Sequence, residues 1–268
     1  DTPELREIFP DCLAKVSDFY TELGQNRKLF ERYVALREHP GFDTLDIERK
    51  RVITNAIRNF QLAGVDLNDK ARDEFRVLQA KLSDLGNQFE RNLLDSTESW
   101  HLDITDNQLL AGLPQSAIDL GRQAAQTANV DGWRFGLQMP AYLPIIRYAD
   151  NRELRKQFYT AYSTRASELQ NQGQYDNASV MREILQARQT LAQLHNRPHF
   201  ADYALTTKMA ESANEVISFL NDLNAAAKPV AEQEVADLIE FVANTGGPNK
   251  LQAWDMAYYS EKLRKQNF

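Results

Sequence analysis

The 268-residue sequence has few of the residues that build metal cages, disulfide frameworks and turn-rich folds. Its single cysteine, Cys12, excludes both an internal disulfide and a cysteine metal cage, and a cytoplasmic location is therefore expected. Glycine is sparse, with 11 residues. The apolar runs are far shorter than the roughly 18 residues of a membrane-spanning helix, and no signal peptide is visible, so no membrane partner is expected.

The charge balance also excludes a class of partner. The formal net charge is −7, and no stripe of Lys and Arg with interleaved aromatic residues occurs, so nucleic acid is not an expected partner. Hydrophobic residues make up 43% and charged residues 26%, which is typical of a globular protein. The length suits one large domain or two small ones.

Most of the chain has the apolar spacing of α-helices. The clearest stretch is "ARDEFRVLQAKLSDLGNQFERNLLDS", in which apolar residues recur every three or four positions from Phe75 to Leu93. Local start signals predict further helices. These signals are Thr2 before Pro3, Asp150 with Glu153, Asp176, and Ser212 with Glu215.

Two short stretches differ from the helical pattern. Residues 100–105 ("WHLDIT") and 133–139 ("WRFGLQM") are rich in β-forming residues and predict one small two-stranded ribbon. The fold class is therefore mainly α, a bundle-like lobe of about ten helices with this ribbon, in which residues 1–268 form a single helical unit.

Three smaller expectations concern prolines and the cysteine. Pro140 and Pro144 are expected to keep their segment out of regular helix, because proline lacks the N–H that a helix interior uses. Pro229 either interrupts a helix or starts the next one. Cys12 stands beside Leu13 in a helical pattern and is expected to be a small buried hydrophobic residue.

The stretch "LHNRPHF" carries two histidines four residues apart. A helical zinc motif would need both on one face with a glutamate after the first, but Asn196 follows His195. Pro198 also disfavours helix between the histidines, so His195 should end one helix and His199 begin another. We interpret the stretch as a polar helix connection, and we predict no metal ligand and no catalytic residue anywhere in the chain.

Two aromatic stretches have two interpretations each. "MPAYLPIIRYADN" contains Tyr142 and Tyr148, and "AWDMAYYSEK" contains Trp254, Tyr258 and Tyr259. These five side chains either pack in the core or form the wall of a channel that admits peptides. The sequence pattern alone favours core packing, and the five residues are kept as candidates for a substrate channel.

Several stretches taken together resemble a known enzyme family. They are "LSDLGNQFERNLLDST", "FGLQMPAYLPIIRYADNRELRKQFYTAYSTRAS", "ILQARQTLAQLHNRPHFADYALTTKMAES" and "LQAWDMAYYSEKLRK". They resemble, in order along the chain, the thimet oligopeptidase and oligopeptidase A family of zinc metallopeptidases. The resemblance implies a cytosolic, mostly helical enzyme with two lobes that hydrolyses short peptides in a channel, using zinc held by a His-Glu-x-x-His helix and a later glutamate.

The zinc motif of that family does not occur in this sequence. The resemblance therefore implies the N-terminal, non-catalytic part of a larger peptidase, truncated before the zinc-binding domain and inactive alone. Its expected partners are the missing catalytic lobe and, in the intact enzyme, short peptides and Zn; self-association through exposed apolar surface is also expected. The alternatives are a free-standing helical binding or scaffold protein, or one half of a split peptidase.

Overall fold

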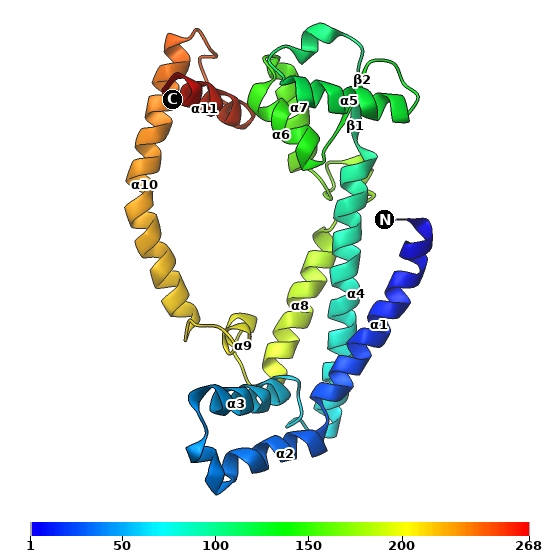
Figure 1. The fold of residues 1–268 in the computed structure, drawn as a ribbon, viewed down its shortest axis with the longest axis vertical. Helices are drawn as coiled ribbons and strands as arrows, with labels where there is room; N and C mark the ends of the chain where they lie inside the picture. Colours follow the sequence, from blue (N-terminus) through cyan, green and yellow to red (C-terminus); the bar gives the residue numbers. More distant parts are fainter. Residues whose placement is uncertain (1, 268) are drawn as a thin grey trace. The chain divides into compact units, whose positions relative to one another are not determined.

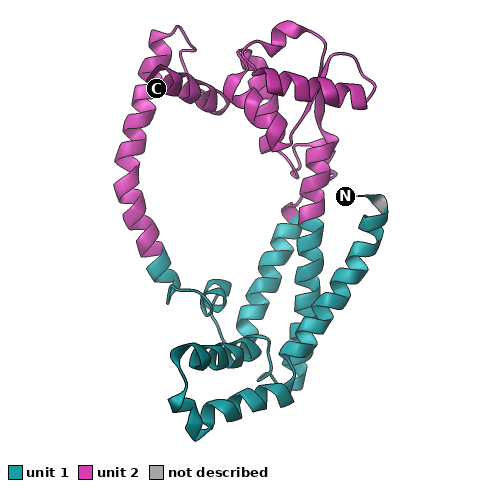
Figure 2. Cartoon of the chain, in the orientation of Figure 1, with its two compact units in different colours: residues 1–89, 179–216 teal, residues 90–178, 217–268 magenta. Residues whose placement is uncertain are grey.

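The computed structural model describes residues 2–267 and confirms a mainly α fold. In this range it contains 11 α-helices and one two-stranded antiparallel sheet. Its contacts divide the chain into two compact units, whereas the sequence predicts a single unit (Figure 2). Unit 1 comprises residues 1–89 and 179–216, and unit 2 comprises residues 90–178 and 217–268.

Unit 1 is built from helices whose caps are visible in the sequence. Thr2 caps the first helix by accepting a hydrogen bond from the Leu5 amide, and Asn26 and Asp46 cap the next two in the same way. The elements that lie wholly or partly in this unit are α1 (Pro3–Gly24), α2 (Arg27–Glu38), η1 (Pro40–Thr44), α3 (Ile47–Leu62), α4 (Asp69–Ser99), α8 (Ala178–Leu194), α9 (Phe200–Leu205) and α10 (Ala213–Asn244).

Helix pairs in unit 1 are joined by specific side-chain contacts. The ring of Phe60 on α3 lies 6.1 Å from that of Phe30 on α2, measured between centroids. Lys81 on α4 forms an ion pair of 2.9 Å with Glu183 on α8, and these helices lie side by side (Figure 1). Buried Gln25, after α1, donates to the Ala63 carbonyl oxygen and accepts from Arg76, so it links α1 to the α3–α4 connection.

Unit 2 contains the ribbon and a buried apolar core. The elements that lie wholly in this unit are β1 (His101–Ile104), η2 (Asn107–Leu110), α5 (Gln115–Thr127), β2 (Trp133–Gly136), α6 (Met139–Tyr148), α7 (Arg152–Ser163), η3 (Asn171–Gly173) and α11 (Ala253–Asn267). The strands are antiparallel, with His101 opposite Gly136 and Ile104 opposite Trp133, which confirms the predicted ribbon. Its inner face packs on the core, where Phe135, Ile145 and Phe158 are at most 1% exposed.

Two expectations about prolines need correction. Pro140 and Pro144 do not exclude regular helix, because α6 spans Met139–Tyr148 and contains both. Pro140 lies in the first helical turn, where its missing N–H costs no helical hydrogen bond, while Pro144 lies in the interior. Pro229 neither ends nor begins a helix, since α10 continues through it from Ala213 to Asn244.

The expectation for Cys12 is also wrong. Its side chain is exposed on α1. The same helix exposes more than half of Phe9, Val16 and Phe19, so a helical apolar pattern did not identify a buried face here. No helix within residues 2–267 is both long enough and apolar enough to cross a membrane.

Candidate functional site

The five aromatic candidates all lie in unit 2, on two helices that pack together. Tyr142 and Tyr148 belong to α6, and Trp254, Tyr258 and Tyr259 belong to α11. Tyr142 and Tyr258 are buried, with 8% and 6% of their surface exposed, whereas the other three are half-buried. The structure therefore brings all five into one region but exposes only three of them appreciably.

Tyr142 is held by an aromatic stack. Its ring lies 4.0 Å from the ring of Tyr162 on α7, with an angle of 15° between the planes. Burial, together with the neighbouring Tyr162, raises the pKa of Tyr142 to about 12. The phenol therefore stays protonated near neutral pH and is suited to packing rather than to proton transfer.

A buried carboxylate, Asp255, fixes the start of α11 on α7. It accepts hydrogen bonds from Arg152 Nη2 at 2.7 Å, from Arg155 Nη2 at 3.0 Å and from the Gln252 amide at 3.0 Å. Burial alone would raise the pKa of Asp255, but these hydrogen bonds outweigh it and lower the pKa below its usual value. Asp255 is therefore ionised and fully engaged at neutral pH.

Arg155 connects the same carboxylate to the aromatic residues. Its guanidinium, 1% exposed, lies 3.9 Å from the Tyr258 ring centroid and donates to the carbonyl oxygens of Ala149 and Asp150. The Tyr258 hydroxyl donates to Asp150 Oδ1 at 2.6 Å, which lowers the pKa of Asp150, while burial raises that of Tyr258. These contacts hold α11 against α6 and α7.

The half-buried aromatic residues lie around this cluster. Lys265 Nζ lies 4.7 Å from the Tyr148 ring centroid, and Lys156 Nζ lies 5.7 Å from that of Trp254. The Tyr259 ring meets Tyr258 edge to face at 5.0 Å. Chemically, the arrangement positions aromatic side chains rigidly, and its carboxylates are occupied by hydrogen bonds rather than free to act as bases.

Arg152, Arg155 and Asp255 are not predicted from the sequence, although they hold the helices of the candidate aromatic residues in place. A signal was present, because Asp255 stands alone among Trp254, Met256 and Tyr258 in a largely apolar helical stretch. Its arginine partners are 100 and 103 residues away, and no local spacing identifies such a pair.

The two histidines lie as the sequence predicts. Helix α8 ends at Leu194, and His199 is the N-cap of α9, so the pair does not share a helix. His195 packs its ring against Phe75 and Tyr203, with centroid distances of 5.7 and 5.0 Å. Across residues 2–267, no group of three or more His, Cys, Asp or Glu side chains is arranged to hold a metal ion.

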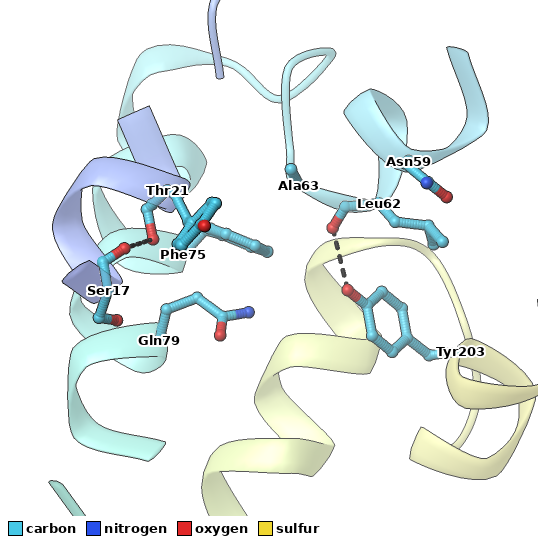
Figure 3. A pocket seen from close by; sticks show the side chains of 9 residues that line it. Ser17, Thr21, Asn59, Leu62, Ala63, Phe75, Gln79 and Tyr203 are labelled. Atoms are coloured by element: carbon cyan, nitrogen blue, oxygen red, sulfur yellow. Dashed lines mark hydrogen bonds between the residues drawn. The ribbon is translucent and has the colours of Figure 1, made fainter. Parts of the chain in front are cut away.

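A pocket of about 390 Å³ in unit 1 is a second candidate site, and its described lining is uncharged. Its lining residues are Ser17, Tyr20, Thr21, Asn59, Leu62, Ala63, Phe75, Gln79 and Tyr203. Two hydroxyls are already used, since Tyr203 donates to the Leu62 carbonyl oxygen at 2.9 Å and Thr21 donates to that of Ser17 (Figure 3). This pocket suits a neutral polar group and contains no acid–base pair.

Comparison with known proteins decides the family. A family model described as peptidase family M3 matches residues 145–268, and one described as the neurolysin/thimet oligopeptidase N-terminal domain matches residues 1–72. The chain is 40% identical to oligopeptidase A of Escherichia coli (strain K12) over 266 residues, which is 99% of this chain. The chain belongs to the thimet oligopeptidase / oligopeptidase A family.

Other members of the family match over the same span. The oligopeptidase A of Salmonella typhimurium is 41% identical over 266 residues, and the probable cytosolic oligopeptidase A of Arabidopsis thaliana is 34% identical over 279 positions. The chain spans 39% of the length of these oligopeptidase relatives. The match to peptidase family M3 includes α7 and α11, and with them Arg152, Arg155 and Asp255.

Proposed function

We propose that this chain is the non-catalytic helical portion of an oligopeptidase A-like zinc metalloendopeptidase that hydrolyses short peptides. One observation carries the proposal: 99% of the chain aligns with oligopeptidase A, yet none of its four histidines is followed by glutamate. The sequence therefore contains no His-Glu-x-x-His motif, and the zinc-dependent step belongs to another part of the parent protein.

The residues present do not fit a zinc site of their own. His195 is packed between aromatic rings, and burial, together with nearby Arg197, lowers its pKa. Its Nε2 is buried without a hydrogen-bond partner, and His199 lies on a different helix cap. We therefore derive no metal-dependent step from this chain, and zinc is proposed only for the intact enzyme.

In the intact enzyme, the chain would form one wall of the substrate channel. The proposed channel residues are Tyr142, Tyr148, Trp254, Tyr258 and Tyr259. The half-buried Tyr148, Trp254 and Tyr259 would touch the peptide. Buried Tyr258 would position Tyr259 through their ring contact, and buried Tyr142 would pack behind them on Tyr162. The missing catalytic lobe is the proposed partner, and a cytoplasmic location is supported by the single cysteine.

The first experiment compares zinc content and peptidase activity of the 268-residue chain with those of the protein encoded by the complete reading frame. The chain alone should hold no stoichiometric zinc and should leave a quenched fluorescent peptide intact, while the longer protein should bind zinc and cleave it. Stoichiometric zinc together with cleavage by the 268-residue chain would overturn the proposal.

In the longer protein, Trp254→Ala should raise KM.

A further inference from the structure

Strand β1 has one edge without a backbone partner. The sheet consists of β1 and β2 alone within residues 2–267, so β1 is paired on one side only. No backbone hydrogen bond in this range joins β1 to any element other than β2. A free strand edge presents unpaired N–H and C=O groups in the spacing of a β-ladder, which makes it a template for another extended chain.

A groove of about 580 Å³ lies beside this edge. One of its walls is formed by three successive residues, Trp100, His101 and Leu102. Successive side chains of an extended chain point to opposite faces. Three of them therefore line the groove together only if it meets the chain at its edge, and not over one face of the ribbon.

Helix α7 contributes a single stripe of side chains to the lining of the groove. The stripe consists of Glu153, Lys156, Gln157, Thr160 and Ala161, with Thr164 at the C-cap, and its spacings of three and four are those of one helix face. From the first to the last of them the helix rises about 16 Å at 1.5 Å per residue. An extended peptide of about five residues has that length at roughly 3.3 Å per residue.

The lining favours a neutral chain that both donates and accepts hydrogen bonds. Glu153 and Lys156 pair with each other at 3.3 Å, which leaves little net charge. Gln170 also lines the groove and is 8% exposed. Its Oε1 accepts from Ser96 at 2.8 Å, but its Nε2 is buried without a partner, and a peptide carbonyl oxygen is the kind of acceptor that would satisfy it.

We propose that an extended oligopeptide of about five residues binds in this groove and adds to β1 as a third strand. Main-chain hydrogen bonds to the β1 edge would hold it, and the α7 stripe would contact its side chains. The site uses no catalytic group. It therefore goes beyond the proposed peptidase role and does not depend on it.

Two neutral pentapeptides with blocked ends, of alternating Thr and Val in the two possible registers, test the proposal by isothermal titration into the 268-residue chain. At least one should bind saturably. In the peptide that binds, N-methylation of the backbone amides one at a time should weaken binding about tenfold at alternate positions and little at those between, because only every second amide faces β1. Equal effects at all positions, or no saturable binding by either peptide, would overturn the proposal.

A pair of α7 variants locates the peptide. Thr160 is exposed and lines the groove, so Thr160→Trp should fill it and abolish binding. Ser163 is exposed on the same helix outside the described lining, so Ser163→Trp should bind the peptide as the unmodified chain does. Loss of binding in both variants, or in neither, would place the peptide elsewhere. A dimer of the chain that the peptide disrupts would instead assign the β1 edge to a second copy of the chain.

Discussion

At the scale of single residues, the ionic cluster of unit 2 is the feature with the largest expected energetic effect. Asp255 and Arg155 have essentially no exposed surface, and charges so deeply buried are tolerated only when they are paired and hydrogen-bonded. Both conditions hold here, because each group has several partners at 2.7 to 3.2 Å. The cluster therefore fixes where α11 packs on α7.

Removing the carboxylate should reveal this dependence. Asp255→Ala leaves the Arg155 guanidinium buried without its counter-charge, so it should lower the free energy of unfolding of unit 2 by about 3–5 kcal/mol. Glu153→Ala is the matched control, because its ion pair with Lys156 is exposed and contributes no more than about 1 kcal/mol. Urea titrations followed by circular dichroism compare them, and similar losses in the two variants would contradict the burial argument.

His195 should make the stability of unit 1 sensitive to mildly acidic pH. Burial, with nearby Arg197, lowers its pKa below 6.5, so the unfolded chain takes up a proton at a higher pH than the folded chain. The stabilising contribution is therefore complete above about pH 6.5 and is lost as the pH falls through the folded pKa. This window lies above the range in which most carboxylates titrate.

Substitution of His195 tests this dependence. The unfolding midpoint of unit 1 should fall between about pH 7.5 and pH 5.5 in the unmodified chain, and His195→Phe should remove most of that fall because it keeps an aromatic ring without a titrating nitrogen. His199→Gln changes an exposed cap residue and should leave the fall in place. An unchanged pH dependence in His195→Phe would show that other groups cause it.

At the scale of helices and strands, the sequence predicts what local chemistry decides. The caps at Thr2 and Ser212 are correct, because a cap hydrogen bond joins residues only three apart. The prediction that Pro144 prevents a regular helix is wrong, because the adjacent Ile145 and Ile146 are buried in the core of unit 2. Burying two isoleucines offsets a lost helix hydrogen bond, and that burial depends on distant parts of the chain.

The candidate site, too, could be predicted from the sequence only where it depends on local features. Its aromatic residues stand out in the sequence, because Tyr142 and Tyr148 lie in one short stretch and Trp254 and Tyr258 in another. The ion pairs that join the two stretches cross about a hundred residues, and only the fold brings them together. For the same reason, the sequence could not separate the buried Tyr258 from the half-buried Tyr259.

Two glycines in helices allow a matched test of packing. A Cβ atom on Gly121 in α5 would overlap the Phe135 ring, whereas a Cβ on Gly86 in α4 would meet nothing within 4 Å. Gly86→Ala should therefore stabilise the chain by about 0.4–1 kcal/mol through helix propensity. Gly121→Ala should destabilise it by about 1–2 kcal/mol, because overpacking outweighs the same gain. Thermal unfolding measures both, and effects of equal sign would contradict the close approach of α5 to β2.

At the scale of the whole molecule, the main feature is a set of exposed apolar side chains on α10. Ile217, Leu220 and Leu223 recur every three residues on α10, and each is 54–55% exposed. Within the described range, only Leu238 and Val242 of this helix are buried, and both lie in its last turns. Apolar faces of this kind mark interaction surfaces in folded proteins. In the intact enzyme the proposed occupant is another part of the same polypeptide.

Without that occupant, we expect the 268-residue chain to self-associate through α10. Its sedimentation coefficient should increase with concentration, because dimerisation removes the apolar face from water. The double variant Leu220→Ser with Leu223→Ser should remain monomeric, since both side chains belong to that face. Met209→Ser is the control, because Met209 is fully exposed and lies outside α10, so it should associate as the unmodified chain does. A monomer at every concentration would show that the α10 face does not drive association, and equal effects of the two variants would place the interface elsewhere.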